Sequence, residues 1–328
     1  MIISRTPFRV SFFGGGTDFP EFYREHGGAT LATGIDKYCY LSVHSLGPFF
    51  KHRLRVSYAQ TETVNHASDI QHPLIRECLG LLDMDVGMEI NHVADLPGRT
   101  GLGSSSSFTV GLLHSLHAFR GERPDAGQLA RESIIVERER VGDAGGHQDQ
   151  YAAAFGGLRR FNFTADGVTA KPIEIARERR NALSDRLLMF FTGVESSAEN
   201  ILQEQKRRVS HNLPALREML AMVDEAEQLL TGNDDLAAFG RLLHASWLRK
   251  RSLSSGISNS AIDQAYEAAI RAGSLGGKLL GAGGRGFLLV YVEPETQATV
   301  RAAMTGLQEI PFNFSDEGSR IIFQAPES

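Results

Sequence analysis

A single stretch of sequence decides the fold: Pro97-Gly98-Arg99-Thr100-Gly101-Leu102-Gly103-Ser104-Ser105-Ser106-Ser107. Its glycines allow a tight turn and let the backbone approach a ligand closely. The serines stand directly before the apolar run 108–113, where a helix is expected to begin. Hydroxyls, free backbone N–H groups and the positive end of the helix dipole therefore converge on one anion site, which suits a nucleotide phosphate. The alternative is a Gly/Ser linker, but linkers do not run straight into an amphipathic helix.

This loop differs from the two most familiar nucleotide-binding motifs. A P-loop needs a lysine beside its last glycine, and no lysine lies near Ser104. The G-x-G-x-x-G spacing of dinucleotide-binding folds is also absent. The phosphate charge must therefore be met by hydroxyls, amides, a metal ion and basic groups from elsewhere in the chain.

Composition narrows the class of protein. The chain has 328 residues, enough for two domains, and its 42% hydrophobic and 22% charged content is ordinary for a globular protein. A net charge of −5 gives no basic surface for nucleic acid or anionic membrane. The only two cysteines, Cys39 and Cys78, lie in apolar surroundings, which indicates buried thiols. No apolar run is long enough to cross a membrane. The first residues lack a signal-peptide pattern. We expect a cytoplasmic protein without membrane or nucleic-acid partners. Whether it forms a homo-oligomer is left open by the sequence.

The order of the expected elements favours an α+β fold. Alternating patterns predict strands at 8–13, 38–44, 53–58 and 87–92, and helices from the serines through about residue 119 and over 125–141. An apolar strand at 187–192 opens a second domain, followed by helices at 196–208, 212–231, 234–253 and 259–272. A strand at 286–292, a helix at 294–307 and a strand at 318–323 complete it. Because no regular βαβ repeat appears, we predict two α+β domains, residues 1–180 and 181–328.

Two further glycine clusters carry candidate functional residues. The first cluster, Gly14-Gly15-Gly16, follows a predicted strand that contains Arg9, and Thr17 and Asp18 come directly after it. Arginine can stabilise a transferring phosphoryl group, and an aspartate can bind a polyol; a glycine hairpin with a capping Thr-Asp pair is the alternative. The second, residues 276–287, has too many glycines for a strand interior, so the backbone is kinked or closely approached. Its alternative is a simple loop-to-strand junction.

Two acidic residues between these clusters suit magnesium-dependent phosphoryl transfer. That reaction needs one carboxylate for the metal and one acidic group facing the attacking hydroxyl. Glu137, on a predicted helix, and Asp149, between a glycine-rich turn and the apolar stretch 151–155, could fill these roles. A solvated helix face is the alternative for Glu137.

The three glycine clusters resemble, in order and spacing, the motifs of the galactokinase–homoserine kinase–mevalonate kinase–phosphomevalonate kinase (GHMP kinase) superfamily. The resemblance spans residues 5–286, although Arg285 stands where the third motif has a glycine. It implies an N-terminal domain of ribosomal-S5-like fold, a ferredoxin-like C-terminal domain with added helices, and ATP with Mg²⁺ between them.

The resemblance also implies residue roles. Asp149 resembles the catalytic aspartate and Arg9 the arginine that steadies it; Ser105 and Glu137 resemble the magnesium ligands. The implied ATP-binding residues are Pro97, Gly98, Gly101, Leu102, Gly103, Ser104, Ser105, Ser106 and Ser107. The implied substrate-binding residues are Gly15, Gly16, Thr17, Asp18, Trp247, Lys250, Arg251, Lys278, Gly283 and Gly284.

Within the superfamily, residues 13–20, 145–157 and 244–251 resemble the bacterial heptose kinases. This implies an ATP-dependent kinase for the anomeric C1 hydroxyl of D-glycero-D-manno-heptose 7-phosphate, giving the 1,7-bisphosphate for nucleotide-activated heptose in capsule or lipopolysaccharide. A fucokinase- or galactokinase-like enzyme acting on an unphosphorylated sugar is the rival interpretation, although Gly15-Gly16 replace the Glu-His of galactokinases.

The substrate's own phosphate would need a second basic pocket. His244, Trp247 and Arg251 share one helix face and could form it, with Lys250 and Lys278 nearby; a packed tryptophan with solvated basic neighbours is the alternative. From another class, a catalytically inactive nucleotide- or sugar-binding regulator is disfavoured, because a pure binder need not keep Glu137, Asp149 and Arg9 together.

Overall fold

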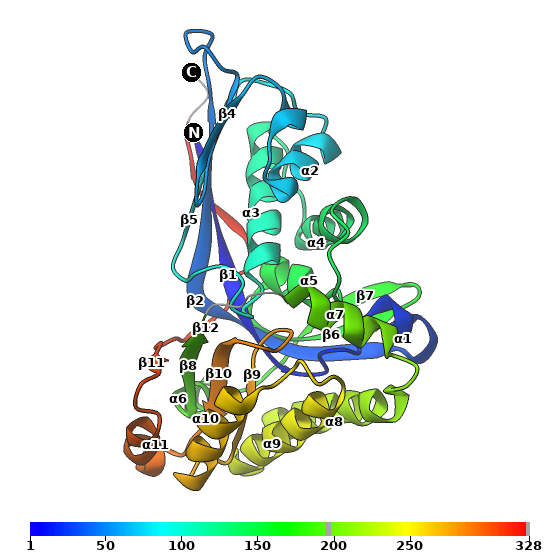
Figure 1. Ribbon diagram of the computed structural model, residues 1–328, viewed down its shortest axis with the longest axis vertical. Coiled ribbons are helices and arrows are strands. Elements are labelled where there is room, and N and C mark those ends of the chain that lie inside the picture. The colour runs from blue at the N-terminus through cyan, green and yellow to red at the C-terminus, as the bar shows by residue number, and fades with distance from the viewer. Residues whose placement is uncertain (194–197, 326–328) are drawn as a thin grey trace.

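The computed structural model describes residues 1–193 and 198–325 and contains two β-sheets, one above the other in Figure 1. The first sheet has the order β13-β1-β2-β5-β3-β4, and β12 and β6 also pair with β2, while β7 pairs with β6. All of its pairings are antiparallel except that of β3 with β5. Its strands are β1 (Ile2–Phe13), β2 (Gly28–Ser45), β3 (Leu54–Ser57), β4 (Thr61–Val64), β5 (Met88–Ala94), β6 (Leu158–Thr164), β7 (Gly167–Pro172), β12 (Phe314–Ser315) and β13 (Arg320–Gln324).

Helices cover one face of the first sheet (Figure 1). The central one, α3 (Ser104–Phe119), packs on β1 and β2 because almost its whole surface is apolar or small and buried. Around it lie α2 (Pro73–Leu81), α4 (Ala126–Ile134) and α5 (Gln148–Phe155), while α1 (Pro20–His26) lies beside β6 and the 3₁₀ turn η1 (Ala67–Asp69) precedes α2. The larger hydrophobic core fills the space between this helical layer and the sheet and continues into the second half of the chain, where it includes Phe239 and Leu289.

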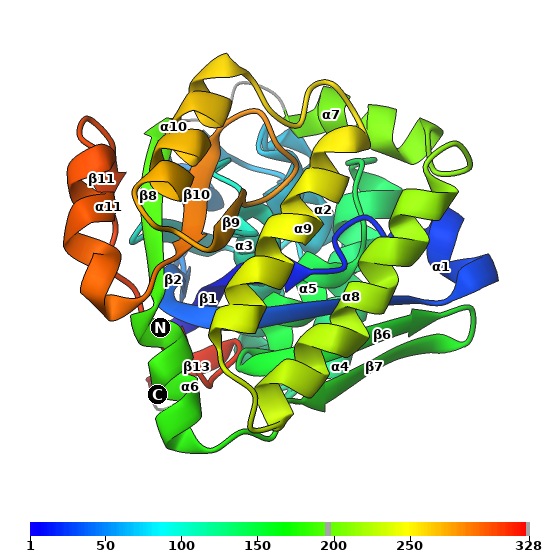
Figure 2. The ribbon, with the colours of Figure 1, turned by 90° about the horizontal axis from the view of Figure 1, so that it is seen from below.

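The second sheet has the antiparallel order β11-β8-β10-β9. Its strands are β8 (Leu187–Gly193), β9 (Gly276–Leu279), β10 (Gly286–Tyr291) and β11 (Gln308–Glu309). Figure 2 shows α8 (Leu213–Thr231) and α9 (Ala237–Ser252) side by side beneath the first sheet. The remaining elements are α6 (Arg177–Asp185), α7 (Ala198–Arg207), α10 (Ser260–Arg271), η3 (Pro294–Thr296) and α11 (Gln297–Ala303), and a second core centres on Trp247.

The predicted α+β class is confirmed, but two expected helices need correction. The helix expected over 294–307 is the 3₁₀ turn η3 followed by α11, which ends at Ala303. The helix expected over 125–141 is an α-helix only to Ile134 and continues as a π-helix, η2 (Ile135–Arg140), which contains Glu137. A π-turn is wider than an α-turn and rotates the following side chains, which the sequence pattern does not show. The chain also returns late to the first sheet through β12 and β13, so the boundary between residues 180 and 181 stays a prediction.

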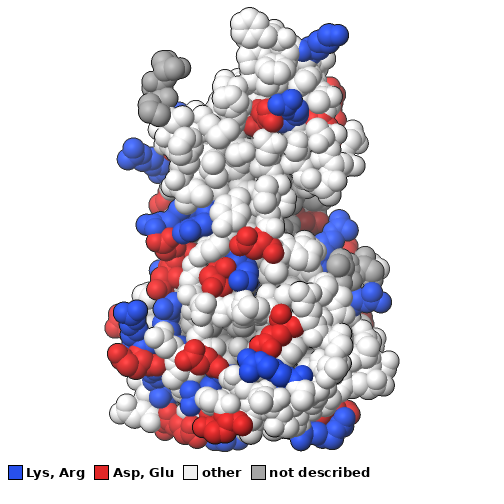
Figure 3. Space-filling view, turned by 90° about the vertical axis from the view of Figure 1, so that its left-hand side faces the viewer, with Lys and Arg blue, Asp and Glu red and all other residues white. Residues whose placement is uncertain are grey.

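The outer face of the first sheet lies opposite its helices. Figure 3 shows that Lys, Arg, Asp and Glu gather on the lower part of this side of the molecule, whereas its upper part is mostly uncharged. Val93, Ile322 and Phe323 are exposed side chains of the strands β5 and β13. Within the described ranges, none of the helices has the length and apolar content needed to span a bilayer.

Candidate active site

A cleft of about 940 Å³ lies between the two halves of the chain. Its walls come from the end of β1, the loop before α3, the π-helix, the start of α5, α7 and the β9–β10 loop. Most residues expected to bind ligands line it: Arg9, Gly15, Gly16, Asp18, Gly98, Gly101, Gly103, Ser104, Ser105, Ser106, Glu137, Asp149, Lys250 and Lys278. The expected residues Pro97, Leu102, Ser107, Thr17, Trp247, Arg251, Gly283 and Gly284 do not belong to this lining.

The serine-rich loop starts α3 as expected. Gly103 precedes the helix in the left-handed conformation (φ 72°), which favours glycine, and the N–H of Ser107 donates to its carbonyl at 2.9 Å. Ser104 and Ser105 lie at the open helix N-terminus in the cleft. Ser107 instead donates to the carbonyl of Pro7 at 2.8 Å, so this fourth hydroxyl joins the helix to β1. Of these four serines, the first three therefore line the cleft.

The serine-rich loop and the last glycine cluster, residues 276–287, touch through their backbones. A Cβ on Gly101 would lie 2.4 Å from the carbonyl oxygen of Leu280, and one on Gly281 would lie 2.4 Å from the Cα of Gly101. Both glycines have positive φ, so a larger residue would be strained at either position. In contrast, Gly283 packs on Ile257 and the N–H of Gly284 donates to the Ile257 carbonyl, which turns this pair away from the cleft.

Arg9 and Asp149 form a bidentate ion pair in the cleft. Nε of Arg9 donates to Oδ1 of Asp149 at 2.9 Å and Nη2 to Oδ2 at 2.8 Å. Nη1 of Arg9 donates to the carbonyl of Gly101 at 2.6 Å, which ties the pair to the serine-rich loop. The Arg9 side chain is 5% exposed and that of Asp149 24%, so the carboxylate faces the cleft from a rigid support.

Glu137 is a buried carboxylate beside the serine loop. Its side chain is 1% exposed and accepts hydrogen bonds from Ser106 at 3.0 Å, Ser133 at 3.1 Å and Gln150 at 2.8 Å. Burial raises its pKa, and the Nη2 of Arg138 lies 3.8 Å away. The hydroxyl that the serine-rich loop gives to this carboxylate belongs to Ser106 rather than to Ser105, which is one position earlier on α3.

These residues fit a magnesium ion. A buried carboxylate that lines a cleft requires positive charge nearby, and Mg²⁺ prefers oxygen ligands. No group of three His, Cys, Asp or Glu side chains in the described part of the chain converges as a metal site. Glu137 would therefore hold the ion together with a serine hydroxyl, water and phosphate oxygens, as Mg²⁺ commonly binds in nucleotide enzymes.

Asp18 is fixed by the backbone around it. Its carboxylate accepts from the N–H of Gly16 at 2.9 Å and from that of Gln148 at 3.2 Å, and burial raises its pKa. A Cβ on Gly146 would lie 2.0 Å from its Oδ2, so the glycine is required there. Thr17 is buried behind this turn, where its hydroxyl donates to the carbonyls of Gly14 and Ala29.

The basic helix face expected to hold a phosphate is turned away from the cleft. Trp247 is fully buried in the second core, and its neighbours His244 and Arg251 contact Tyr266 and Asp263, at 2.6 and 3.4 Å. The prediction that these three residues share one face of α9 is therefore confirmed, but α10 covers that face. Lys250, the residue before Arg251 on α9, lines the cleft and donates to the carbonyl of Gly281.

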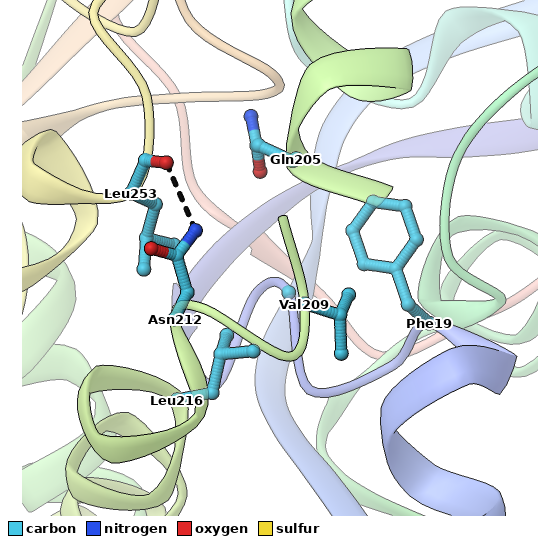
Figure 4. A pocket seen from close by; sticks show the side chains of 7 residues that line it. Phe19, Gln205, Val209, Asn212, Leu216 and Leu253 are labelled. Carbon is cyan, nitrogen blue, oxygen red and sulfur yellow. Dashed lines mark hydrogen bonds between the residues drawn. The ribbon is translucent and has the colours of Figure 1, made fainter. Parts of the chain in front are cut away.

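A second small cavity of about 10 Å³ lies beside the cleft, large enough for roughly one water molecule. Figure 4 shows Phe19 and Gln205 at its border, with the amide of Asn212 bonded to the carbonyl of Leu253 at 2.9 Å. Phe19, Gln205 and Gly16 line the cleft as well, so α7 forms the wall opposite the first glycine cluster.

Two family models match the chain. The model "GHMP kinases N terminal domain" matches residues 67–157 and "GHMP kinases C terminal" matches residues 222–307. The chain belongs to the GHMP kinase family. Sugar kinases of this family are phosphotransferases with an alcohol acceptor. The two loops that meet in the cleft, residues 97–107 and 276–287, lie within the matched regions.

Individual relatives agree with the GHMP assignment. The chain is 27% identical to D-glycero-alpha-D-manno-heptose 7-phosphate kinase of Campylobacter jejuni, with 97% of both chains covered. It is 29% identical to L-fucokinase/L-fucose-1-P guanylyltransferase of Bacteroides fragilis, over 69% of this chain and 24% of that protein. The solved structure of a D-glycero-D-manno-heptose 1-phosphate kinase from Bacteroides thetaiotaomicron has the same fold, with a TM-score of 0.81, 22% identity and coverage of 99% and 100%.

Sequence reasoning missed a ring cluster in the part of this kinase's cleft beside α2. His72 stacks on Phe108 with 5.1 Å between ring centroids. Tyr58 lies edge-on to His72 at 4.7 Å, and His92 lies edge-on to Phe108 at 4.9 Å. Burial lowers the pKa of both histidines, and the Nδ1 of His72 is buried without a hydrogen-bond partner. These rings come from four separate segments, so no local motif could have indicated them.

Gln148 was also missed as a site residue. It lies directly before Asp149 at the start of α5, and its side chain accepts from the Ser11 hydroxyl at 2.6 Å. Its position beside Asp149 was the available signal.

Proposed function

We propose that this chain is a sugar kinase that transfers the γ-phosphoryl group of ATP to the C1 hydroxyl of D-glycero-D-manno-heptose 7-phosphate. The full-length relationship to the Campylobacter heptose 7-phosphate kinase supports this substrate. The observation that carries the proposal is the Arg9–Asp149 pair, which holds one carboxylate at the cleft surface close to the serine-rich loop.

Asp149 orients the acceptor hydroxyl and accepts its proton as the new bond to phosphorus forms. The two guanidinium bonds fix both carboxylate oxygens, so the side chain does not have to reorient during the reaction. An anomeric hydroxyl is more acidic than an ordinary alcohol, which makes a carboxylate sufficient as the acceptor of this proton.

The serine loop binds the nucleotide phosphates. Ser104, Ser105 and the N-terminal N–H groups of α3 donate to their oxygens, and the rings around His72 hold the base. When bound at Glu137, Mg²⁺ would neutralise charge on the phosphate oxygens. Arg9 contributes positive charge where the phosphoryl group moves.

The acceptor lies between the first glycine cluster and α7. Asp18 is held rigidly enough to accept from sugar hydroxyls, and Gly15 and Gly16 leave room for a sugar ring against the backbone. Lys250 and Lys278 supply positive charge for the phosphate that this substrate already carries.

A coupled assay of ADP release tests the proposal. Heptose 7-phosphate, the same heptose without phosphate, fucose, galactose and mevalonate are compared, with Asp149→Ala as the inactive control. We expect turnover only with heptose 7-phosphate. Faster turnover of fucose would favour a fucokinase, in line with the fucokinase relative, and ADP release with none of these acceptors would contradict a sugar kinase.

A further inference from the structure

Lys278 is a cation in an unusual place. It lies on β9 with 3% of its surface exposed, and its Nζ donates to the carbonyl of Phe12 at 2.8 Å. Phe12 stands at the register shift between Ser11 and Phe13, where β1 and β2 lose their regular pairing. No carboxylate in the described ranges lies within 4.0 Å of this Nζ. A buried ammonium without an ion pair is strongly disfavoured.

The surroundings of Lys278 add more positive charge than negative. Burial lowers its pKa well below the ordinary value, and the neighbouring charges of Lys250 and Arg9 lower it further. Asp18 acts in the opposite direction, but its carboxylate is already bonded by backbone N–H groups. The charge of Arg9 is matched by Asp149, so no neighbouring carboxylate remains as a dedicated partner for Lys278.

We propose that Lys278 forms an anion subsite whose counter-ion is a phosphate group of the bound ligand, so that phosphate binding adds a proton to the enzyme. The side chain lines the cleft, where a phosphate can reach it. In the free enzyme the uncharged amine donates an N–H to Phe12, which satisfies that carbonyl without burying a charge. A phosphate dianion reverses the balance, and the amine takes a proton from solvent to become the ammonium.

The subsite deepens the proposed function, because two phosphates could occupy it: the one already on the sugar or the γ-phosphate of the nucleotide. Both present the same dianionic oxygens. At pH 8 a phosphate monoester, with a second pKa of about 6, is already a dianion. Proton uptake at this pH therefore reports on the enzyme rather than on the ligand.

Isothermal titration calorimetry tests the proposal with the wild-type enzyme. Binding is measured at pH 8 in two phosphate-free buffers of different ionisation enthalpy, so that the difference in heat gives the number of protons taken up. The ligands are heptose 7-phosphate, the same heptose without phosphate, and ADP or a non-hydrolysable ATP analogue with Mg²⁺. If heptose 7-phosphate is the only ligand that causes proton uptake, the phosphate at Lys278 is that of the sugar. If the ATP analogue causes uptake and ADP does not, the phosphate at Lys278 is the γ-phosphate.

Lys278→Met provides the matched variant. We expect the uptake to disappear and the dissociation constant of the responsible ligand to rise roughly 10- to 100-fold, as for the loss of one hydrogen bond between charged groups. Lys171→Met is the control, because Lys171 is an exposed lysine paired with Glu227. No uptake with any ligand, or equal uptake in Lys278→Met, would overturn the proposal. The calorimetry does not depend on turnover, so the subsite and the kinase reaction fail separately.

Discussion

Replacing Arg9 by methionine tests the support of Asp149 directly. The change removes two hydrogen bonds between charged groups, at 2.9 and 2.8 Å, and leaves the carboxylate without a partner. Each such bond contributes roughly 1.5–3 kcal/mol. Because Asp149 is 24% exposed, water replaces part of this interaction, and we expect a loss of about 2–3 kcal/mol in the free energy of unfolding. For a chain of this size that lowers Tm by roughly 4–10 °C.

The catalytic effect should exceed the structural one. Proton transfer by a positioned carboxylate contributes roughly 10²–10⁴-fold to the rate, so Asp149→Asn should lower kcat within that range. Arg9→Met should lower kcat by at least 100-fold, since it frees the same carboxylate and removes charge near the phosphoryl group. The double variant should lose much less than the product of the two single effects, because both changes break the same Arg9–Asp149 interaction.

The assay is ADP release at saturating substrates, combined with thermal unfolding of all variants. Arg5→Met is the matched control: Arg5 lies on the same strand and pairs with Glu317 at 2.8 Å, outside the cleft lining. It should keep kcat within twofold. If the effects of Arg9→Met and Asp149→Asn on kcat simply multiply in the double variant, the two residues act independently and the reasoning is refuted.

Three further predictions concern single residues. Glu137→Gln should raise the Mg²⁺ concentration for half-maximal activity at least 10-fold without lowering Tm, because the amide keeps the shape and removes a buried charge; activity against free Mg²⁺ checks this. Arg99 has a positive φ of 59° at the cleft, so Arg99→Gly should raise Tm by a few degrees and yet raise KM for ATP several-fold. Asp83→Gly, which relieves a similar φ of 51° outside the cleft, should raise Tm without changing KM. Burial lowers the pKa of His114 to about 4, below the ordinary value near 6.5, so the unfolded chain binds its proton first and stability falls as pH drops from 6.5 to 4. Denaturant unfolding at pH 7 and 4.5 measures the free energy of unfolding of both proteins. Between these pH values His114→Gln should lose roughly 2–3 kcal/mol less of it than the wild type. An equal loss in both proteins would show that His114 is not the group responsible.

Local signals predicted the start of α3 well. The glycine before α3 and the run of serines determine a helix start through interactions within a few residues, and the structure has them there. Which serine of the loop bonds to Glu137 could not be predicted in this way. Neighbouring residues on a helix point about 100° apart, and only the packing of α3 on the π-helix selects one of them.

Long-range contacts explain the other differences. The spacing of His244, Trp247 and Arg251 correctly places them on one face of α9, but whether α10 or the cleft covers that face depends on tertiary packing. The meeting of Gly101 with Gly281 joins loops that are 180 positions apart. Here the resemblance to known kinases supplied what residue patterns alone did not, including the partnership of Arg9 with Asp149.

The position of β13 has a consequence for biosynthesis. This strand occupies the edge of β1 at residues 2–5, although it is encoded more than 300 positions later. While the ribosome is still translating, the N–H and C=O groups on that edge have no strand beside them, and such an edge can pair with a neighbouring chain. A nascent polypeptide lacking residues 320–324 would therefore be vulnerable to aggregation until its final strand emerges.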